Sequence, residues 1–407
     1  MSPDVGATPE AAAAPRPGTL AEVFLAFLKL GASSFGGPIA HLGYFRAEFV
    51  ERRRWLSEQA YVDIVALSQF LPGPASSQTG FAIGLMRGGP LGGLAAWAGF
   101  TLPSVVLLLA FAYGARQIAD APWGAGLLHG LKLVAVAIVA QAVLGMARTL
   151  CPDKARATIA TAALALLLFA PGSLAQISAI ALGGAAGLAF SRESGAATPD
   201  SLAVPVSRGA GLACVVVYLA LLAPAFVPAG GLFGLFAAFY RSGALVFGGG
   251  HVVLPLLRDA VVAPGWVSDN AFLQGYGAAQ AVPGPLFAFA AYLGARAGAP
   301  PAGLVGAAVA LTGIFLPGFL VMTGALPFWR ALRTNAQAQS AMRGVNAAVV
   351  GLLGAALYSP VWTSAVLTQV DFAIAAAGFV LLVVWRTPPL AVVLLSAAAG
   401  IGLAAAG

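Results

Sequence analysis

The strongest constraint on this chain is a set of helix-breaking motifs that occurs twice in an apolar sequence. Three segments recur in the same order at an offset of 211 to 214 residues: SFGGP at 34–38 as VFGGG at 246–250, QFLPGP at 69–74 as QAVPGP at 280–285, and TLP at 101–103 as FLP at 315–317. Glycine and proline interrupt a helix, so each half is predicted to contain helices broken at matching places. Such an internal repeat limits the fold to two related halves.

Composition decides the environment of these halves. Of the 407 residues, 60% are hydrophobic and only 9% are charged, whereas a soluble domain is about one quarter charged. Apolar stretches long enough to cross a bilayer recur, for example at 124–146. The chain is therefore predicted to be an all-α integral membrane protein of the lipid bilayer, with several passes. Broken helices at matching places in two halves are typical of membrane transporters.

The net charge of +7 does not indicate nucleic acid as a partner, because the basic residues lie in short loops between apolar runs. Two cysteines and three scattered histidines provide no metal-ligand spacing, so neither a metal nor a cofactor is expected. A membrane-embedded enzyme would need an acid, nucleophile or metal set inside the membrane, and the sequence contains no such set.

The predicted organisation has four parts. Residues 1–19 form a disordered tail and 20–190 the first repeat; 191–228 contain a polar cytoplasmic loop and a linking transmembrane helix; 229–407 form the second repeat. Each repeat is expected to begin with re-entrant or broken helical hairpins. Four spanning helices then follow, in the first repeat near 91–116, 124–147, 155–170 and 173–190.

Loop charges indicate that the two repeats have inverted topology. The loop after the first hairpin carries four arginines within 46–54, but its counterpart at 255–268 has only Arg258. Conversely, the loop at Asp120 has no basic residue, while its counterpart holds Arg330 and Arg333. Parallel repeats would place matching loops on one face and leave this bias unexplained.

Four basic residues within apolar segments form two repeat-related pairs, Lys29 with Arg241 and Lys132 with Arg343. A cation at the bilayer centre costs about 2.5–3.5 kcal/mol on insertion scales, so it needs a partner, a water-filled cavity or a ligand. One interpretation is a site for an anion. The alternative is that long side chains reach a nearby headgroup region.

The break motifs supply the other candidate residues for an anion site. Adjacent glycines allow close backbone approach, and the first amide groups of the helix after Pro-Gly-Pro lack helical partners. The alternatives are a tight turn or close helix packing through small residues. The candidates are Gly36, Gly37, Gly248, Gly249, Gly73, Gly284, Ser76, Ser77, Gln69 and Gln280, and in repeat two Phe287 and Ala288 replace the two serines.

The motifs resemble the chromate transporter family in its two-domain form. The resemblance is carried by FGGPIAHLGYF at 35–45, WL at 55–56 and QFLPGPASSQ at 69–78, with FGGGH at 247–251 and PGP at 283–285 in the second half. It covers about 20–400 and implies export of chromate across the inner membrane of a bacterium, with chromate resistance as the result. Sulfate, also a tetrahedral dianion, is the near alternative, and a channel is less favoured. The driving force is the membrane potential, the proton gradient or both, and a homodimer is compatible with the sequence.

Overall fold

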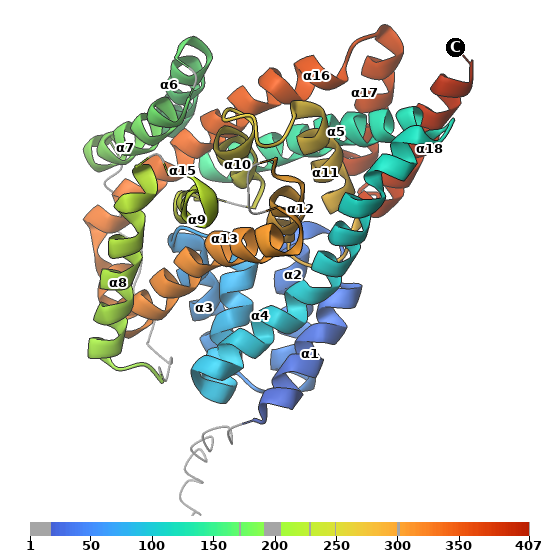
Figure 1. Ribbon diagram of the computed structural model, residues 1–407. Helices are drawn as coiled ribbons and strands as arrows, with labels where there is room; N and C mark the ends of the chain where they lie inside the picture. The colour runs from blue at the N-terminus through green and yellow to red at the C-terminus, as the bar shows by residue number, and fades with distance from the viewer. Residues whose placement is uncertain are drawn as a thin grey trace, which may run out of the picture.

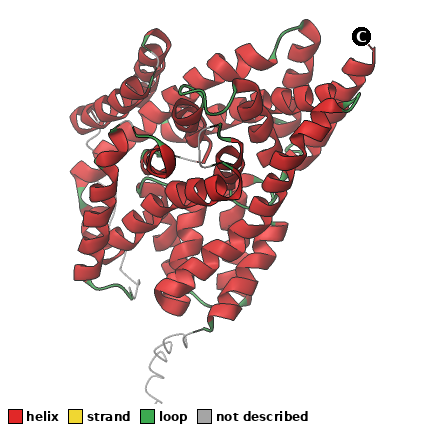
Figure 2. Cartoon of the chain, viewed as in Figure 1, coloured by secondary structure: helices red, strands yellow, loops and turns green. Residues whose placement is uncertain are grey.

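The fold is all-helical over the residues that the computed structural model describes, which are 18–170, 172–190, 205–227, 229–248, 250–298 and 302–406. No strand occurs among them (Figure 2). Within these ranges, five helical segments are long and apolar enough to cross a membrane. The predicted class, an all-α multi-pass membrane protein, is confirmed.

The first repeat and the linking helix contain the following elements: α1 (Leu20–Ser33), α2 (Gly37–Phe45), the π-helix η1 (Arg46–Arg52), α3 (Glu58–Phe70), α4 (Ala75–Asp120), α5 (Gly124–Leu150), α6 (Lys154–Phe169), α7 (Ser173–Phe190), α8 (Arg208–Leu222) and η2 (Pro224–Phe226). Helix α4 has non-helical backbone at Gly88 and Gly89, so it consists of two helices joined at a kink. Helices are thus present at each of the four places where spanning helices were predicted.

The second repeat follows the same plan but is divided into more elements: α9 (Gly231–Ala244), η3 (Gly250–Val252), α10 (Val253–Val261), α11 (Asp269–Ala281), η4 (Leu286–Ala288), α12 (Phe289–Arg296), α13 (Gly303–Ala325), η5 (Leu326–Phe328), α14 (Trp329–Thr334), α15 (Ala336–Ala356), η6 (Leu357–Trp362), α16 (Thr363–Ala365), α17 (Gln369–Val383) and α18 (Pro389–Ala406). Matching serines, Ser57 and Ser268, begin α3 and α11 by accepting the amides of Ala60 and Ala271 at 3.2 Å. Such caps satisfy backbone donors that a helix start leaves free.

The helices break at the Phe-Gly-Gly and Pro-Gly-Pro motifs, as predicted, whereas Pro103 and Pro317 of the third repeated motif lie inside α4 and α13. Gly36 and Gly37, with φ of 102° and 76°, separate α1 from α2, and Gly73, with φ of 124°, separates α3 from α4. In the second repeat Gly248 and Gly284 also have positive φ, 74° and 93°. Residues with a Cβ rarely adopt this left-handed region, which explains glycine at these positions. Gly249 lies outside the described residues.

The last helices of the two repeats exchange partners. Helix α18 packs against α5 of the first repeat, and α7 packs against α15 of the second (Figure 1). Small residues make both contacts close: a Cβ built on Gly130 of α5 would lie 2.3 Å from the carbonyl oxygen of Ser396, and one on Gly344 of α15 would lie 2.0 Å from that of Gly183. Close approach through small residues is a common way for membrane helices to associate.

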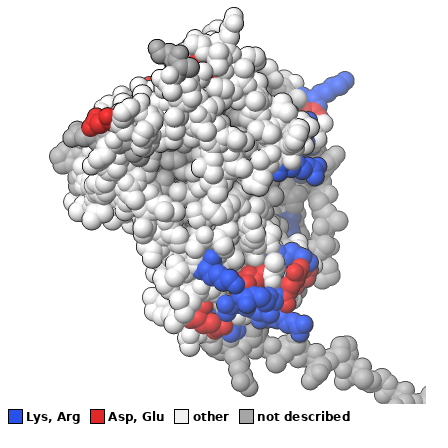
Figure 3. Space-filling view, turned by 90° about the vertical axis from the view of Figure 1, so that its right-hand side faces the viewer, with Lys and Arg blue, Asp and Glu red and all other residues white. Residues whose placement is uncertain are grey.

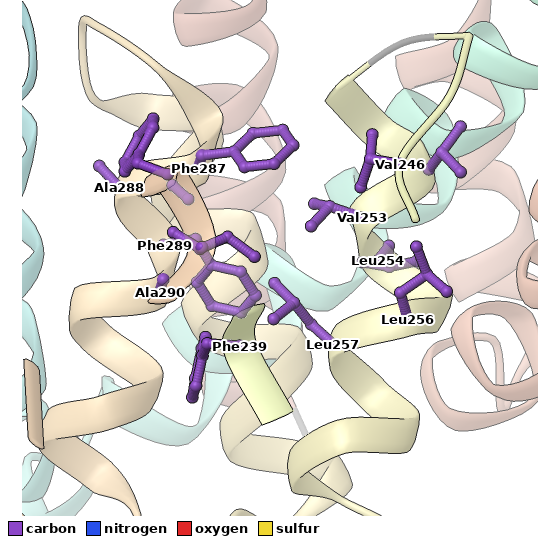
Figure 4. Packing of buried hydrophobic residues seen from close by; sticks show 14 of the residues in the cluster. Phe239, Val246, Val253, Leu254, Leu256, Leu257, Phe287, Ala288, Phe289 and Ala290 are labelled. Carbon is purple, nitrogen blue, oxygen red and sulfur yellow. The ribbon is translucent and has the colours of Figure 1, made fainter. Parts of the chain in front are cut away.

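The second break is embedded in an apolar core. Side chains of α9, α10 and the η4–α12 segment pack around it (Figure 4). Val246, Val253, Phe287 and Ala288 are at most 2% exposed. In the view of Figure 3 most of the surface is uncharged, and the Lys and Arg side chains gather at the lower end and along the right-hand side, together with most of the acidic ones. A largely uncharged surface suits a protein surrounded by lipid.

Candidate anion site

Two hydrogen bonds cross between the repeats at the breaks. The amide of Gly73 donates to the carbonyl oxygen of Val246 at 2.7 Å, and the amide of Gly284 donates to that of Ser34 at 2.9 Å. Because Gly73 matches Gly284 and Val246 matches Ser34, the two bonds are equivalent under the sequence repeat. The Pro-Gly-Pro tip of each half therefore rests on the Phe-Gly-Gly break of the other. The amides of Gly73 and Gly284 are consequently occupied by protein in this structure, where the sequence suggested that such groups would face an anion.

Next to these bonds lies a cavity of about 290 Å³, here called the break cavity. Four of the predicted site residues line it: Gly36, Gly37, Gln280 and Gly284. The structure adds polar residues that were not among the predicted site residues: Gln141, His251, Arg386 and Thr387. The cavity thus combines both break motifs with α5 and the loop between α17 and α18.

The wall of the break cavity offers hydrogen-bond donors and positive charge. Helix α2 begins at Gly37 without a side-chain cap, and a Cβ built on Gly37 would meet nothing within 4 Å. Free amides at a helix start, together with the helix dipole, favour an anion. Gln280 Nε2 is buried and has no hydrogen-bond partner among the described residues. A buried donor without a partner is costly unless a ligand or water satisfies it.

Arg386, which carries a guanidinium group, lines the break cavity and has an unusual backbone. Its φ is 54°, one of two positive values among the described non-glycine residues. Strained backbone of this kind is found preferentially at functional sites. The neighbouring Gln141 donates from Nε2 to the Leu382 carbonyl at 3.4 Å, and His251 Nδ1 lies 2.8 Å from the hydroxyl of Tyr276.

The predicted cation pair does not meet at the break cavity. Lys29 is exposed on α1. Arg241 donates to the carbonyl oxygen of Ala225 at 3.4 Å, lies 5.9 Å from the centre of the Phe226 ring, and lines a small cavity with Gln176. Lys29 and Arg241 are equivalent in the sequence repeat, but they do not lie together at one site.

The second cation pair is bound to protein groups. Lys132 Nζ donates to Asn270 Oδ1 and to the Ser364 carbonyl oxygen, both at 3.3 Å. Arg343 donates to the hydroxyl of Ser340 at 3.0 Å. Neither residue lines the break cavity.

The remaining candidates lie on α3, on α4 and at the second break. Gln69 is exposed, although its repeat equivalent Gln280 lines the cavity. Ser76 and Ser77 are 4% and 3% exposed and belong to the interior behind the break. Ser76 Oγ is 3.5 Å from Nδ1 of His41. Gly248 stands against the side chains of Leu150 and Met146 instead of facing the cavity.

A second cavity, of about 280 Å³, lies beside the loop between α6 and α7 and is here called the distal cavity. Gln176, Arg258, Asp259 and Tyr358 contribute its polar lining. Arg258 is paired with Asp269 at 2.9 and 3.2 Å. Unlike the break cavity, the distal cavity therefore presents acidic as well as basic groups.

Comparison with known proteins identifies the family to which a chain with these paired breaks and this cavity belongs. The family model described as chromate transporter matches residues 21–188 and again 233–401. The chain belongs to the chromate transporter family. Within this family, the two matched segments contain both pairs of breaks and every residue named above as lining the break cavity.

Relatives from the family cover almost the whole chain. A chromate transport protein of Pseudomonas aeruginosa is 30% identical over 395 residues, which are 95% of this chain and 92% of the relative. A probable chromate transport protein of Synechococcus elongatus is 27% identical over 81% of this chain and 82% of its own. A chromate transport protein of Cupriavidus metallidurans is 26% identical over 83% and 82%. No solved structure matches the chain.

Proposed function

We propose that this chromate transporter family member exports chromate from the cytoplasm and that the break cavity receives the anion. The observation that carries the proposal is the lining of this cavity. An uncapped helix start at Gly37, the unpartnered Nε2 of Gln280 and the guanidinium of Arg386 all suit a tetrahedral dianion. Among the described residues that line it there is no Asp or Glu.

The proposed topology places the break cavity on the cytoplasmic side. We take each hairpin to enter the membrane and return, and each helical segment that follows the hairpins, as well as the linking helix α8, to cross once. This includes α6 and α17, which have 16 and 15 residues and are shorter than the five segments identified above as long enough to span. Eight crossings then separate the arginine-rich loop at 46–54 from the loop of Arg386, namely the second part of α4, α5, α6, α7, α8, α13, α15 and α17. An even number leaves both loops on one face, and the positive-inside rule makes that face cytoplasmic.

The direction of transport agrees with the membrane potential. Moving one charge is worth about 2.3 kcal/mol per 100 mV, so a dianion gains about 4.6 kcal/mol per 100 mV on leaving a negative interior. Export can therefore run on the potential, and chromate resistance of the cell would follow from it. The same energetics apply to sulfate, which remains the near alternative as substrate.

Transport into inside-out vesicles with an imposed, interior-positive potential tests the proposal. We expect Gln280→Leu and Arg386→Gln each to lower the initial rate of chromate uptake by about tenfold or more, since each removes a hydrogen bond to a charged ligand. Gln69→Leu, at the matching but exposed position, should retain the wild-type rate.

Three outcomes would count against the proposal. If the wild-type protein moves no chromate, chromate export is excluded. If it takes up sulfate and not chromate, sulfate is the substrate. Full uptake by both Gln280→Leu and Arg386→Gln would exclude the break cavity as the site.

A further inference from the structure

A group of buried polar side chains lies behind the first break and outside the lining of the break cavity. It is here called the hydroxyl–imidazole cluster and consists of Ser34, His41, Ser76, Ser77 and Thr101. Their exposures are 0%, 1%, 4%, 3% and 2%. Polar groups this deeply buried normally have hydrogen-bond partners.

Contacts of Ser34, His41 and Ser76, and of Phe100 next to Thr101, place the cluster near the crossed hydrogen bonds. His41 Nδ1 is 3.5 Å from Ser76 Oγ, and the imidazole ring is 5.1 Å from the ring of Phe100, the residue before Thr101. The carbonyl oxygen of Ser34 accepts the amide of Gly284 at 2.9 Å. Gly284 also lines the break cavity, so the cluster and the cavity are in contact through this residue.

Four atoms of the cluster lack a hydrogen-bond partner among the described residues: Ser34 Oγ, His41 Nε2, Ser77 Oγ and Thr101 Oγ1. Leaving buried groups unpaired lowers stability. A hydroxyl can donate, and an imidazole nitrogen can either donate or accept according to its tautomer. The cluster therefore contains three hydroxyl donors, those of Ser34, Ser77 and Thr101, for which the described residues provide no acceptor.

The second repeat shows that the fold does not need polar groups at these positions. The residues at the matching positions are Val246, Val253, Phe287, Ala288 and Phe315, which are all buried, with exposures of at most 2%. Figure 4 shows four of them, Val246, Val253, Phe287 and Ala288, within an apolar core. The same backbone plan is thus built with an apolar interior in one half and with unpaired donors in the other.

We propose that the hydroxyl–imidazole cluster is a second, inner binding site for the tetrahedral oxyanion. This inference rests on the proposed function. An anion leaving the break cavity would replace the hydrogen bond between Gly284 and Ser34 and would then accept from the hydroxyls, the imidazole and the first amides of α4. Uncharged donors bind a dianion without a permanent ion pair, which allows release to the other face.

Isosteric substitutions separate this role from a structural one. Ser34→Ala, Ser77→Ala and Thr101→Val each remove an unpaired hydroxyl and leave the packing almost unchanged. If the hydroxyls have no role in transport, their removal raises the melting temperature in detergent or leaves it unchanged, and the rate of transport is unaffected. If they bind the anion, the initial rate of chromate uptake falls by about tenfold in each variant while the melting temperature does not fall.

Ser68→Ala and Thr79→Val are the matched controls, because these buried hydroxyls are hydrogen-bonded to each other at 2.9 Å. We expect them to lower the melting temperature and to retain the uptake rate. If the wild-type protein takes up chromate and all three cluster variants do so at the same rate, the inner site is excluded and the proposed function stands. Wild-type protein that transports neither chromate nor sulfate would overturn both.

Discussion

Glu48 pairs with two arginines at the base of the first hairpin. Its side chain is buried, accepts from Arg52 and accepts Nε of Arg53 at 2.7 Å, while the Arg53 guanidinium lies 5.2 Å from the centre of the Trp55 ring. Burial raises the pKa of Glu48, but the hydrogen bonds and charges of the two arginines outweigh it and hold the pKa below its ordinary value of 4.5. The ion pairs therefore stabilise the fold above pH 4.5, and this contribution is lost as the pH falls through the lowered pKa. We predict that Glu48→Gln lowers the melting temperature at neutral pH and that its difference from wild type shrinks in acid. Glu51→Gln, at an exposed position, should differ little from wild type at any pH. A difference for Glu48→Gln that stayed constant into acid would contradict the assignment.

At the scale of helices, the exchange of partners between repeats depends on glycine. A Cβ on Gly344 would lie 2.0 Å from the carbonyl oxygen of Gly183 and 2.7 Å from Cα of Gly187, both on α7. Because these neighbouring atoms belong to the backbone, they cannot move aside as a flexible side chain can. Helices α7 and α15 would therefore have to move apart. We predict that Gly344→Ala destabilises the protein by about 1–3 kcal/mol, measured by thermal unfolding in detergent. Gly145→Ala on α5 is the control, because its Cβ would meet nothing within 4 Å; it should be neutral or stabilising by up to about 1 kcal/mol. Equal melting temperatures for the two variants would show that the glycine contact does not hold these helices.

At the scale of the whole molecule, the two cavities are expected to open to opposite faces. Five proposed crossings, α7, α8, α13, α15 and α17, separate the loop beside the distal cavity from the loop of Arg386. The matching loops after the first hairpins provide the test, because Glu51 and Ala263 are exposed and occupy equivalent positions. In a background without Cys151 and Cys214, we predict that a membrane-impermeant maleimide labels Glu51→Cys only in inside-out vesicles and Ala263→Cys only in right-side-out vesicles. Labelling of both from one face would mean that the repeats are parallel and would remove the basis for placing the break cavity inside.

Much of the helical plan follows from local sequence, whereas the cavity does not. The glycines and prolines locate the breaks because their backbone preferences act within a few residues. For the same reason the motifs pointed to Gly36, Gly37, Gln280 and Gly284, which the structure places together. Arg386 and Gln141 belong to no motif and reach the cavity only because α18 packs against α5. Lys29 could not be placed from charge alone, since a duplicated cation does not reveal which side of its helix meets the other repeat.

The reciprocal hydrogen bonds between the breaks have a kinetic consequence. If one tip moved away alone, a buried amide and a buried carbonyl would each lose their partner, and that half-open state would be high in free energy. Because the tip of each half rests on the other half, the motion that frees Gly73 also displaces the surface against which Gly284 is held. The two tips should therefore exchange their bonds in one cooperative step with a single barrier. Such a cycle scarcely populates a state open to both faces, and this protects the membrane potential from leakage of small ions.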